Sequence, residues 1–238
     1  MKIVIVGAGR AGHSFATALS QCGHEVALCH HEQPMVEPDT DVVLLCVPDD
    51  ALIETSQSLV VSPSTVVAHC AGSRTLDVLT PHDRTGSLHP LVALPNPAIG
   101  AARLLGATFC VAGDEVMKDI VRSLGGRSFS LPDDLRAAYH ATACVTANHL
   151  VTLLGQVGRL AAAAGLTLED FLPLAQSALD DVALFGPSRA LTGPASRGDL
   201  VTIDAHLSAI GEEERATYVA MANAALQLAE QSTLVRRS

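Results

Sequence analysis

The 238-residue sequence lacks several features that mark common protein classes. It has 15 lysines and arginines against 25 aspartates and glutamates, which gives a formal net charge of −10. This shortage of basic residues argues against a nucleic-acid-binding surface and against an anionic membrane surface as partner. Its 6 cysteines form no C-x-x-C pair and no zinc-ligand spacing, so no metal site is predicted. Most of them sit in apolar runs, and we expect them to be reduced in a cytoplasmic protein.

The sequence also has no internal repeat, no low-complexity tract and no clear membrane span. The first predicted strand begins at residue 2, which leaves no room for a targeting peptide ahead of it. One segment, Ala137–Gly158, contains no Asp, Glu, Lys or Arg, but it does carry polar residues such as His140, Asn148 and Gln156. It is too polar for lipid, so we expect a helix that is buried inside protein.

What the sequence does contain, at its start, is a dinucleotide-binding signature. The apolar run Lys2–Val6 leads into Gly7-Ala8-Gly9-Arg10-Ala11-Gly12, which fits G-x-G-x-x-G. Gly7 permits a tight turn, Gly9 lets the backbone approach a pyrophosphate, and Gly12 lets the next helix lie against the strand. The helix that follows would direct its N–H groups at phosphates, so this loop, with Arg10 and Ala11, is predicted to bind a cofactor. The alternative is a glycine-rich turn in another kind of α/β protein.

The residues after the second predicted strand favour NADP over NAD. A helix over Ala11–Cys22 and a strand over Glu25–Cys29 complete a unit of about 30 residues. NAD sites usually carry Asp or Glu at the end of this strand, whereas here His30 and His31 occupy it. Histidine can donate a hydrogen bond to a 2′-phosphate, and Arg10 can pair with it. In the alternative, both histidines are solvated and Glu32 reaches the ribose of NAD.

The rest of the chain divides into an α/β part and a helical part. Apolar runs predict strands over 41–47, 65–69, 107–111 and 127–131, with helices over 50–59, 75–79 and 115–124. Val47 and Pro48, at the end of the first of these runs, are assigned to the cofactor site. Alanine-rich helices are predicted over 134–164, 168–184, 199–211 and 212–235. We therefore predict a Rossmann domain with a parallel, doubly wound sheet over residues 1–131, and an all-α domain over 132–238.

Four short sequence segments indicate a particular family of Rossmann proteins. They are SLHPL at 87–91, GATFCVAGD at 106–114, YHATACVTANHLVTL at 139–153 and ALTGPASRGD at 190–199. With these strings the chain resembles a family of Rossmann-like NADP oxidoreductases with a C-terminal helical domain of unknown function. That family lies within the 6-phosphogluconate and β-hydroxyacid dehydrogenase superfamily, which includes ketopantoate reductase and pyrroline-5-carboxylate reductase. The resemblance implies NADP-linked redox chemistry on a small molecule and leaves the substrate open.

Four residues are candidates for chemistry. Asn148 resembles the asparagine that follows a lysine by four residues in β-hydroxyacid dehydrogenases, but Cys144 stands here in place of that lysine. His140 lies on the same predicted helical stripe and could donate a proton, and His89 could lie at the carboxyl edge of the sheet. Arg197 offers a planar fork for a carboxylate. The alternatives are a satisfied polar stripe, a loop-ordering histidine and a surface arginine.

Three functions fit these residues. The first is reduction of a small oxo acid or imine by NADPH, with a ketopantoate-type reaction as one candidate. The second is a non-catalytic NADP-binding sensor or regulator, which the missing lysine keeps open. The third is hydride transfer between NADP and a deazaflavin, which would need a wide, flat cleft. We also expect a homodimer formed by the helical domain, because Ala216–Ala229 is apolar around much of its circumference.

Overall fold

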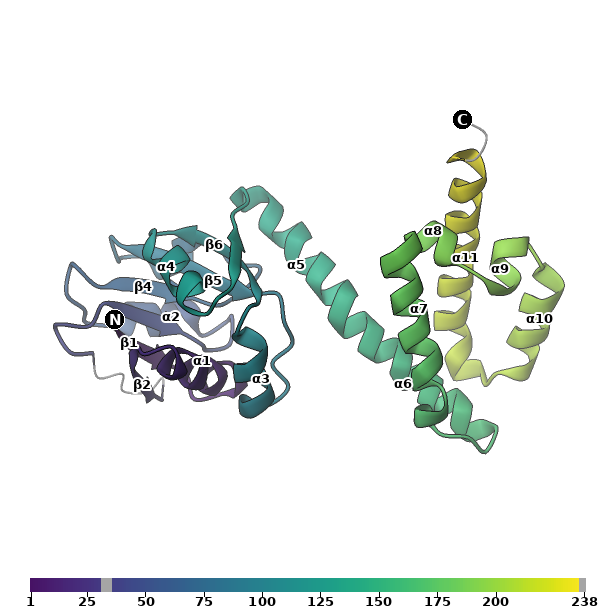
Figure 1. Ribbon diagram of the computed structural model, residues 1–238, viewed down its shortest axis with the longest axis horizontal. Helices are drawn as coiled ribbons and strands as arrows, with labels where there is room; N and C mark the ends of the chain where they lie inside the picture. The colour runs from purple at the N-terminus through teal and green to yellow at the C-terminus, as the bar shows by residue number, and fades with distance from the viewer. Residues whose placement is uncertain (31–35, 236–238) are drawn as a thin grey trace. The chain divides into compact units, whose positions relative to one another are not determined.

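The structure is a computed structural model that describes residues 1–30 and 36–235, with side chains described as far as residue 230. The chain forms two compact units, Met1–Asn148 and His149–Ser238, and Figure 1 labels their helices and strands. The predicted assignment of dinucleotide binding to residues 1–131 and of a helical domain to 132–238 stays a prediction.

A seven-stranded sheet forms the centre of the first unit, in the order β2-β1-β3-β4-β5-β6-β7. Its strands are β1 (Lys2–Val6), β2 (Glu25–Cys29), β3 (Val42–Leu45), β4 (Val66–His69), β5 (Thr85–Pro90), β6 (Thr108–Gly113) and β7 (Arg127–Phe129). Neighbouring strands are parallel, except that β6 runs antiparallel to β5. The predicted Rossmann class is therefore confirmed, with a sheet that is mostly parallel. The strand β5 was not among the predicted strands, and it contains His89.

Helices cover both faces of this sheet, as a doubly wound fold requires. Buried residues of α1 (Arg10–Gln21), α3 (Pro97–Leu104) and α4 (Val116–Ser123) belong to one apolar cluster with the sheet, and those of α2 (Leu52–Ser58) and η1 (Leu76–Leu79) belong to another. The turn η2 (Asp133–Leu135) and the helix α5 (Arg136–Cys144) follow β7 in the chain. Side chains of a strand alternate between faces, and β1 shows this directly. Ile3 and Ile5 belong to one buried apolar cluster, whereas Val4 and Val6 belong to another. Both faces of the sheet are thus covered by apolar side chains.

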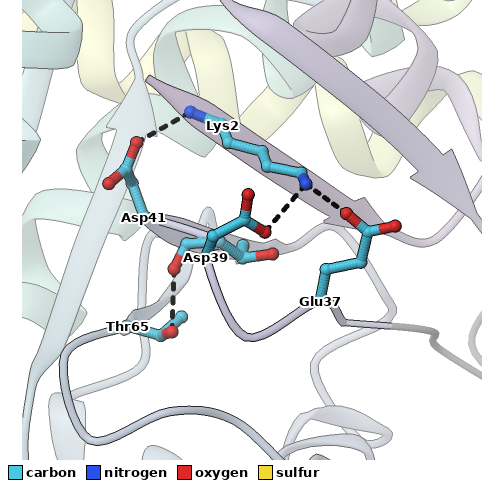
Figure 2. Close-up of polar contacts among 6 residues, drawn as sticks. Lys2, Glu37, Asp39, Asp41 and Thr65 are labelled. Carbon is cyan, nitrogen blue, oxygen red and sulfur yellow. Dashed lines mark hydrogen bonds and ion pairs between the residues drawn. The ribbon is translucent and has the colours of Figure 1, made fainter.

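Lys2 joins the chain segments at the amino edge of the sheet (Figure 2). Its backbone N–H donates to the Asp41 carboxylate at 2.8 Å, and its Nζ donates to the Asp39 carboxylate at 2.8 Å and also to Glu37. The hydroxyl of Thr65 donates to the carbonyl of Thr40 at 2.8 Å. These contacts hold the N-terminal ends of β1, β3 and β4 together. They therefore also constrain the relative positions of the C-terminal ends of these strands.

The second unit is entirely helical. A π-helical turn, η3 (Val145–His149), leads into it, and its elements are α6 (Leu150–Ala163), η4 (Leu168–Asp170), α7 (Leu172–Phe185), α8 (Pro187–Ala190), α9 (Gly193–Arg197), α10 (Leu200–Ala209) and α11 (Glu212–Val235). Glu214 at the start of α11 is buried and accepts hydrogen bonds from Arg159 of α6 at 2.5 and 3.0 Å. Gln156 also donates to the carbonyl of Glu214 at 3.0 Å. The short helices α8 and α9 were not predicted.

Apolar side chains on these helices remain exposed. The segment Ala137–Gly158 was expected to be buried, yet Val145 is 56% and Val151 is 68% exposed in the single chain. That expectation is wrong for one chain taken alone. Within the described ranges, no single helix is long and apolar enough to cross a membrane. One bent pair of segments, Asp133–Ala163 with Leu168–Phe185, has the length and composition of a membrane span when the two are taken together.

Candidate functional site

The first part of the site is the glycine loop between β1 and α1. Gly7 is buried with a φ of 110°, and a Cβ added to it would lie 2.5 Å from the carbonyl oxygen of Cys46 and 3.2 Å from a methyl carbon of Val47. Its N–H donates to the carbonyl of Cys29 at 2.9 Å. The ends of β1, β2 and β3 therefore meet where the strand order reverses, which is the place where open α/β sheets bind ligands.

The other two glycines of the loop differ in what surrounds them. A Cβ on Gly12 would lie 1.8 Å from the carbonyl oxygen of Gly7, so this glycine is required for α1 to pack against the loop. A Cβ on Gly9 would meet nothing within 4 Å. Gly9 is the N-cap of α1, with no side-chain cap and no acidic residue in the first turn. The positive end of the 12-residue helix α1 is thus open at Gly9. The packing of the protein does not require a glycine at this position.

The remaining residues predicted to bind the cofactor surround this loop. Arg10 is exposed and Ala11 half-buried in the first turn of α1, while His30 is exposed directly after β2. Val47 is half-buried and Pro48 exposed after β3. His31 lies outside the described residues. The groups present fit a phosphate-bearing dinucleotide, because the loop offers open backbone approach and a cationic side chain.

The second part of the site is a pocket of about 220 Å³ at the carboxyl end of β5. It brings together three of the four residues predicted to be catalytic: His89 from β5, His140 from α5 and Asn148 from η3. Cys144 and the loop after His89 complete much of the lining. The fourth residue, Arg197, is exposed at the end of α9 in the helical unit and does not line this pocket.

His89 is held by Tyr139, a contact that the sequence analysis missed. The two side chains share a hydrogen bond of 2.6 Å between His89 Nδ1 and the Tyr139 hydroxyl, with their rings edge to face at 5.5 Å. Burial lowers the pKa of His89 to about 4, and the neighbouring His140 and Arg136 act in the same direction. Burial raises the pKa of Tyr139. At neutral pH the pair therefore consists of a neutral imidazole and a protonated phenol.

Gly72, after β4, lies against both histidines and was also missed. A Cβ added there would lie 2.5 Å from His140 Cδ2 and 2.8 Å from His89 Nε2. The two imidazole rings are edge to face at 5.8 Å. His140 Nε2 in turn lies 4.0 Å from the sulfur of Cys144. No signal in the local sequence around Gly72 indicates this close approach, because the three residues come from distant segments.

The π-helical turn explains how one helix lines the pocket over a long stretch. The turn begins directly after Cys144 and contains Asn148. Thr142 donates to the carbonyl of Ala138 at 2.9 Å, and Thr146 donates to the carbonyl of Thr142 at 2.8 Å. Such back-bonding bends helices, and π turns occur frequently at functional sites. The sequence pattern predicts a stripe of His140, Cys144, Asn148 and Thr152, and the first three of these line one pocket whereas Thr152 does not.

A buried arginine on the first turn of α5 lies near the pair of His89 and Tyr139. Arg136 is 1% exposed, and its Nη2 donates to the hydroxyl of Ser87 at 3.0 Å. Its Nε and Nη1 have no hydrogen-bond partner among the residues that the structure describes. His69, on β4, accepts from the N–H of Ala71 through Nδ1 and donates to the carbonyl of Thr75, both at 3.2 Å. Burial lowers the pKa of His69 to about 4, so its imidazole is neutral at neutral pH.

Other kinds of site find no support in the described ranges. No group of three or more His, Cys, Asp or Glu side chains there could hold a metal ion. The 6 cysteines are free thiols.

Comparisons with known proteins bear on the family and on the fold. Residues 107–225, half of the chain, match the model of a family described as "Domain of unknown function (DUF2520)". By sequence, no curated protein matches.

Solved structures match over nearly the whole chain. A Bacteroides fragilis protein whose name assigns it as an NADP oxidoreductase is similar with a TM-score of 0.83 and 20% identity, covering 95% of this chain and 98% of that one. The 1-pyrroline-5-carboxylate reductase of Streptococcus pyogenes has a TM-score of 0.63 at 14% identity, covering 97% and 98%. A reductive aminase of Aspergillus terreus, solved with NADPH and ethyl levulinate, has a TM-score of 0.66 at 14% identity, covering 99% and 98%. At these identities the likeness concerns the fold. The chain therefore belongs to the DUF2520 family, and it has the Rossmann-like fold that NADP oxidoreductases share.

Proposed function

We propose that this protein is an NADPH-dependent reductase of a small oxo acid or imine. The observation that carries the proposal is that the glycine loop and the pocket at His89 lie at the same edge of the sheet. The strands β1 and β5 belong to the same parallel set, so the glycine loop and His89 both lie at its carboxyl edge. The glycine loop and the histidine pocket are thus built on the same end of one sheet, which supports their use in one reaction.

The pocket's size and side chains support a small polar substrate. About 220 Å³ is below the range of about 300–1,000 Å³ that is typical of drug-sized ligands. This size favours an oxo acid or imine over a deazaflavin. The names of the similar structures, which include a pyrroline-5-carboxylate reductase and a reductive aminase, point to the same class of substrate.

In this proposal the glycine loop holds the pyrophosphate at Gly9, and Arg10 and His30 bind the 2′-phosphate. The bound cofactor supplies the hydride. Asn148 donates a hydrogen bond to the substrate heteroatom and polarises it. His89 or His140 delivers the proton that this heteroatom needs as its carbon is reduced. Arg197 as a partner of the substrate carboxylate stays a prediction from the sequence.

The direct test is NADPH oxidation by the purified protein with a panel of 2-oxo acids and cyclic imines. We expect at least one member to be reduced, and His89→Asn to slow that reaction while NADPH binding persists. The second candidate is an NADP-binding sensor, which Cys144 in the place of the usual lysine favours. Tight NADPH binding without reduction of any panel member would overturn the reductase in favour of the sensor.

A further inference from the structure

Tyr139 and Arg136 are two polar side chains next to the pocket that the proposed reaction does not yet use. They lie three residues apart on α5 and therefore on one face of that helix. The Tyr139 hydroxyl is 2.6 Å from His89 Nδ1, and Arg136 Nη2 is 3.0 Å from the hydroxyl of Ser87. Ser87 and His89 are two residues apart on β5, so both project from the same face of the sheet.

Among the described residues, no carboxylate forms an ion pair with Arg136. The groups that interact with it electrostatically or by hydrogen bond are Ser87 and His89 on β5, His69 on β4, Cys110 on β6 and Tyr139 on its own helix. His140 faces His89 from α5. The charge of Asp49 raises the pKa of His69 and of His89, and the charge of Asp77 raises the pKa of His69. A buried guanidinium without a paired anion is costly, and two of its nitrogens have no partner in the described part of the chain. Its surroundings therefore favour the appearance of a negative charge nearby.

The hydrogen bond between Tyr139 and His89 fixes where the imidazole keeps its proton. The phenol is protonated and the imidazole is neutral, so Tyr139 donates to Nδ1 and the ring proton resides on Nε2. Nε2 lies beside Gly72, and His89 lines the pocket. A proton on this atom can pass to a bound substrate.

We propose that Tyr139 and His89 form a proton relay for the reduction, with Arg136 as the counter-charge; this inference rests on the proposed function. As the substrate carbon accepts a hydride, the Nε2–H bond of His89 breaks and its proton bonds to the substrate oxygen or nitrogen. The O–H bond of Tyr139 breaks in turn, and its proton bonds to Nδ1. His89 is neutral before and after the step, and the tyrosinate that remains is stabilised by Arg136. A proton from solvent then bonds to Nε2, and the proton on Nδ1 returns to the tyrosinate oxygen, which restores the starting state.

In this relay His89 is the catalytic residue, whereas Tyr139 and Arg136 are positioning residues that act through it. The chain offers a matched control, because its other tyrosine makes the same contact elsewhere. Tyr218 lies 2.6 Å from His206 Nδ1, with the rings edge to face at 5.9 Å, in the helical unit. Tyr139→Phe and Tyr218→Phe thus remove the same atom from the same kind of pair.

The experiment compares single-turnover hydride transfer from NADPH in the wild type, Tyr139→Phe and Tyr218→Phe across the pH range in which all three stay folded. We expect Tyr139→Phe to bind NADPH normally and to transfer hydride about 10²-fold more slowly, and Tyr218→Phe to match the wild type. The wild-type rate should be nearly constant around neutrality. The Tyr139→Phe rate should rise toward acid pH, because His89 must then be protonated before it can donate.

A second readout needs no substrate. Nitrogen NMR of histidine-labelled full chain, with His89 assigned through His89→Asn, should show protonation at Nε2 in the wild type. Protonation at Nδ1 would overturn the relay, even if Tyr139→Phe failed to fold. Equal rates and equal pH profiles for the wild type and Tyr139→Phe would overturn the relay while the reductase function stands. Absence of any reduction by the wild type would instead overturn the proposed function, and the relay with it.

Discussion

A side chain on Gly12 would begin 1.8 Å from the carbonyl oxygen of Gly7, whereas one on Gly9 would meet no protein atom within 4 Å. Gly7 and Gly12 are therefore coupled by packing. Gly9 has no such contact, which is the pattern expected if only a ligand needs the space at Gly9.

Gly9→Val should therefore abolish cofactor binding without unfolding the protein, while Gly12→Val should destabilise it. Overpacking of this kind typically costs about 1–3 kcal/mol, and the contact at Gly12 is with backbone, which cannot move aside. Urea unfolding and calorimetric titration of NADPH with each variant check the prediction. Undiminished NADPH binding by Gly9→Val would contradict the placement of the pyrophosphate.

We predict tighter binding of NADP(H) than of NAD(H), because Arg10 and His30 are exposed at the ends of α1 and β2 next to the loop. A hydrogen bond to a charged group contributes about 1.5–3 kcal/mol, so Arg10→Ala should weaken NADPH binding by roughly 10- to 100-fold and leave NADH binding unchanged. Calorimetry with both cofactors at one salt concentration measures the difference. Equal or NAD-favouring affinity of the wild type would show that the assignment is mistaken.

Asn148→Ala should lower kcat by about 10²–10³, which is the usual effect of losing one preorganised donor to a developing negative charge. Cofactor affinity should survive, because Asn148 lies in the pocket at β5 and not at the glycine loop. Steady-state kinetics with the substrate found in the panel provide the measurement. A fall of less than about fivefold would place Asn148 in the packing of η3 rather than in the chemistry.

Stability should fall as the solution is acidified. The pKa of His69 and that of His89 are each lowered to about 4 by burial, from about 6.5 in the unfolded chain. Between these values the unfolded chain binds more protons than the folded one, so the free energy of unfolding decreases as pH drops through this window and is constant above it with respect to these two groups. Urea unfolding at several pH values should show this slope, and His89→Gln should make it shallower. An unchanged slope in His89→Gln would contradict the burial argument.

We predict a homodimer formed by the helical unit. Leu184 on α7 is 74% exposed and Val201 on α10 is 81% exposed, and few side chains of this unit are buried. Leu184→Glu and Val201→Glu should reduce the mass from twice 24.7 kDa to 24.7 kDa in light scattering after size exclusion. Val60→Glu is the control, because Val60 is 88% exposed but lies in the sheet unit. A monomeric wild type at micromolar concentration would refute the prediction.

The elements that could be predicted from the sequence are those whose signals are local. The run Lys2–Val6, the glycine loop and α1 follow each other within one short segment, and their roles follow from backbone sterics. The strand β5 mixes polar and apolar residues, and so it has no apolar run to indicate it. The helix α3 was missed although Asn96 accepts from the N–H of Ile99 at 2.9 Å and Pro97 follows it, which is a common helix start.

The candidate site was predicted only in part, because much of it depends on contacts between distant segments. His89, His140 and Asn148 were proposed from residue type and spacing, and they line one pocket. The partners that define their chemistry could not be found this way. Tyr139 meets His89 across 50 positions, and Arg136 meets Ser87 across 49. A pattern search along the chain has no access to such pairs, although Arg136, Tyr139 and His140 do share one helix face.

The close approach at Gly72 has a consequence for the evolution of this family. Residue 72 and the two histidines at 89 and 140 occupy one space, since any Cβ at 72 would overlap the histidine rings. Substitution at one of these three positions should therefore be accompanied by substitution at another. Family members that carry alanine or serine at the position of Gly72 should have replaced His89 or His140 with a smaller residue. In such family members, the proposed proton donor and the residue at position 72 that contacts it would both have changed.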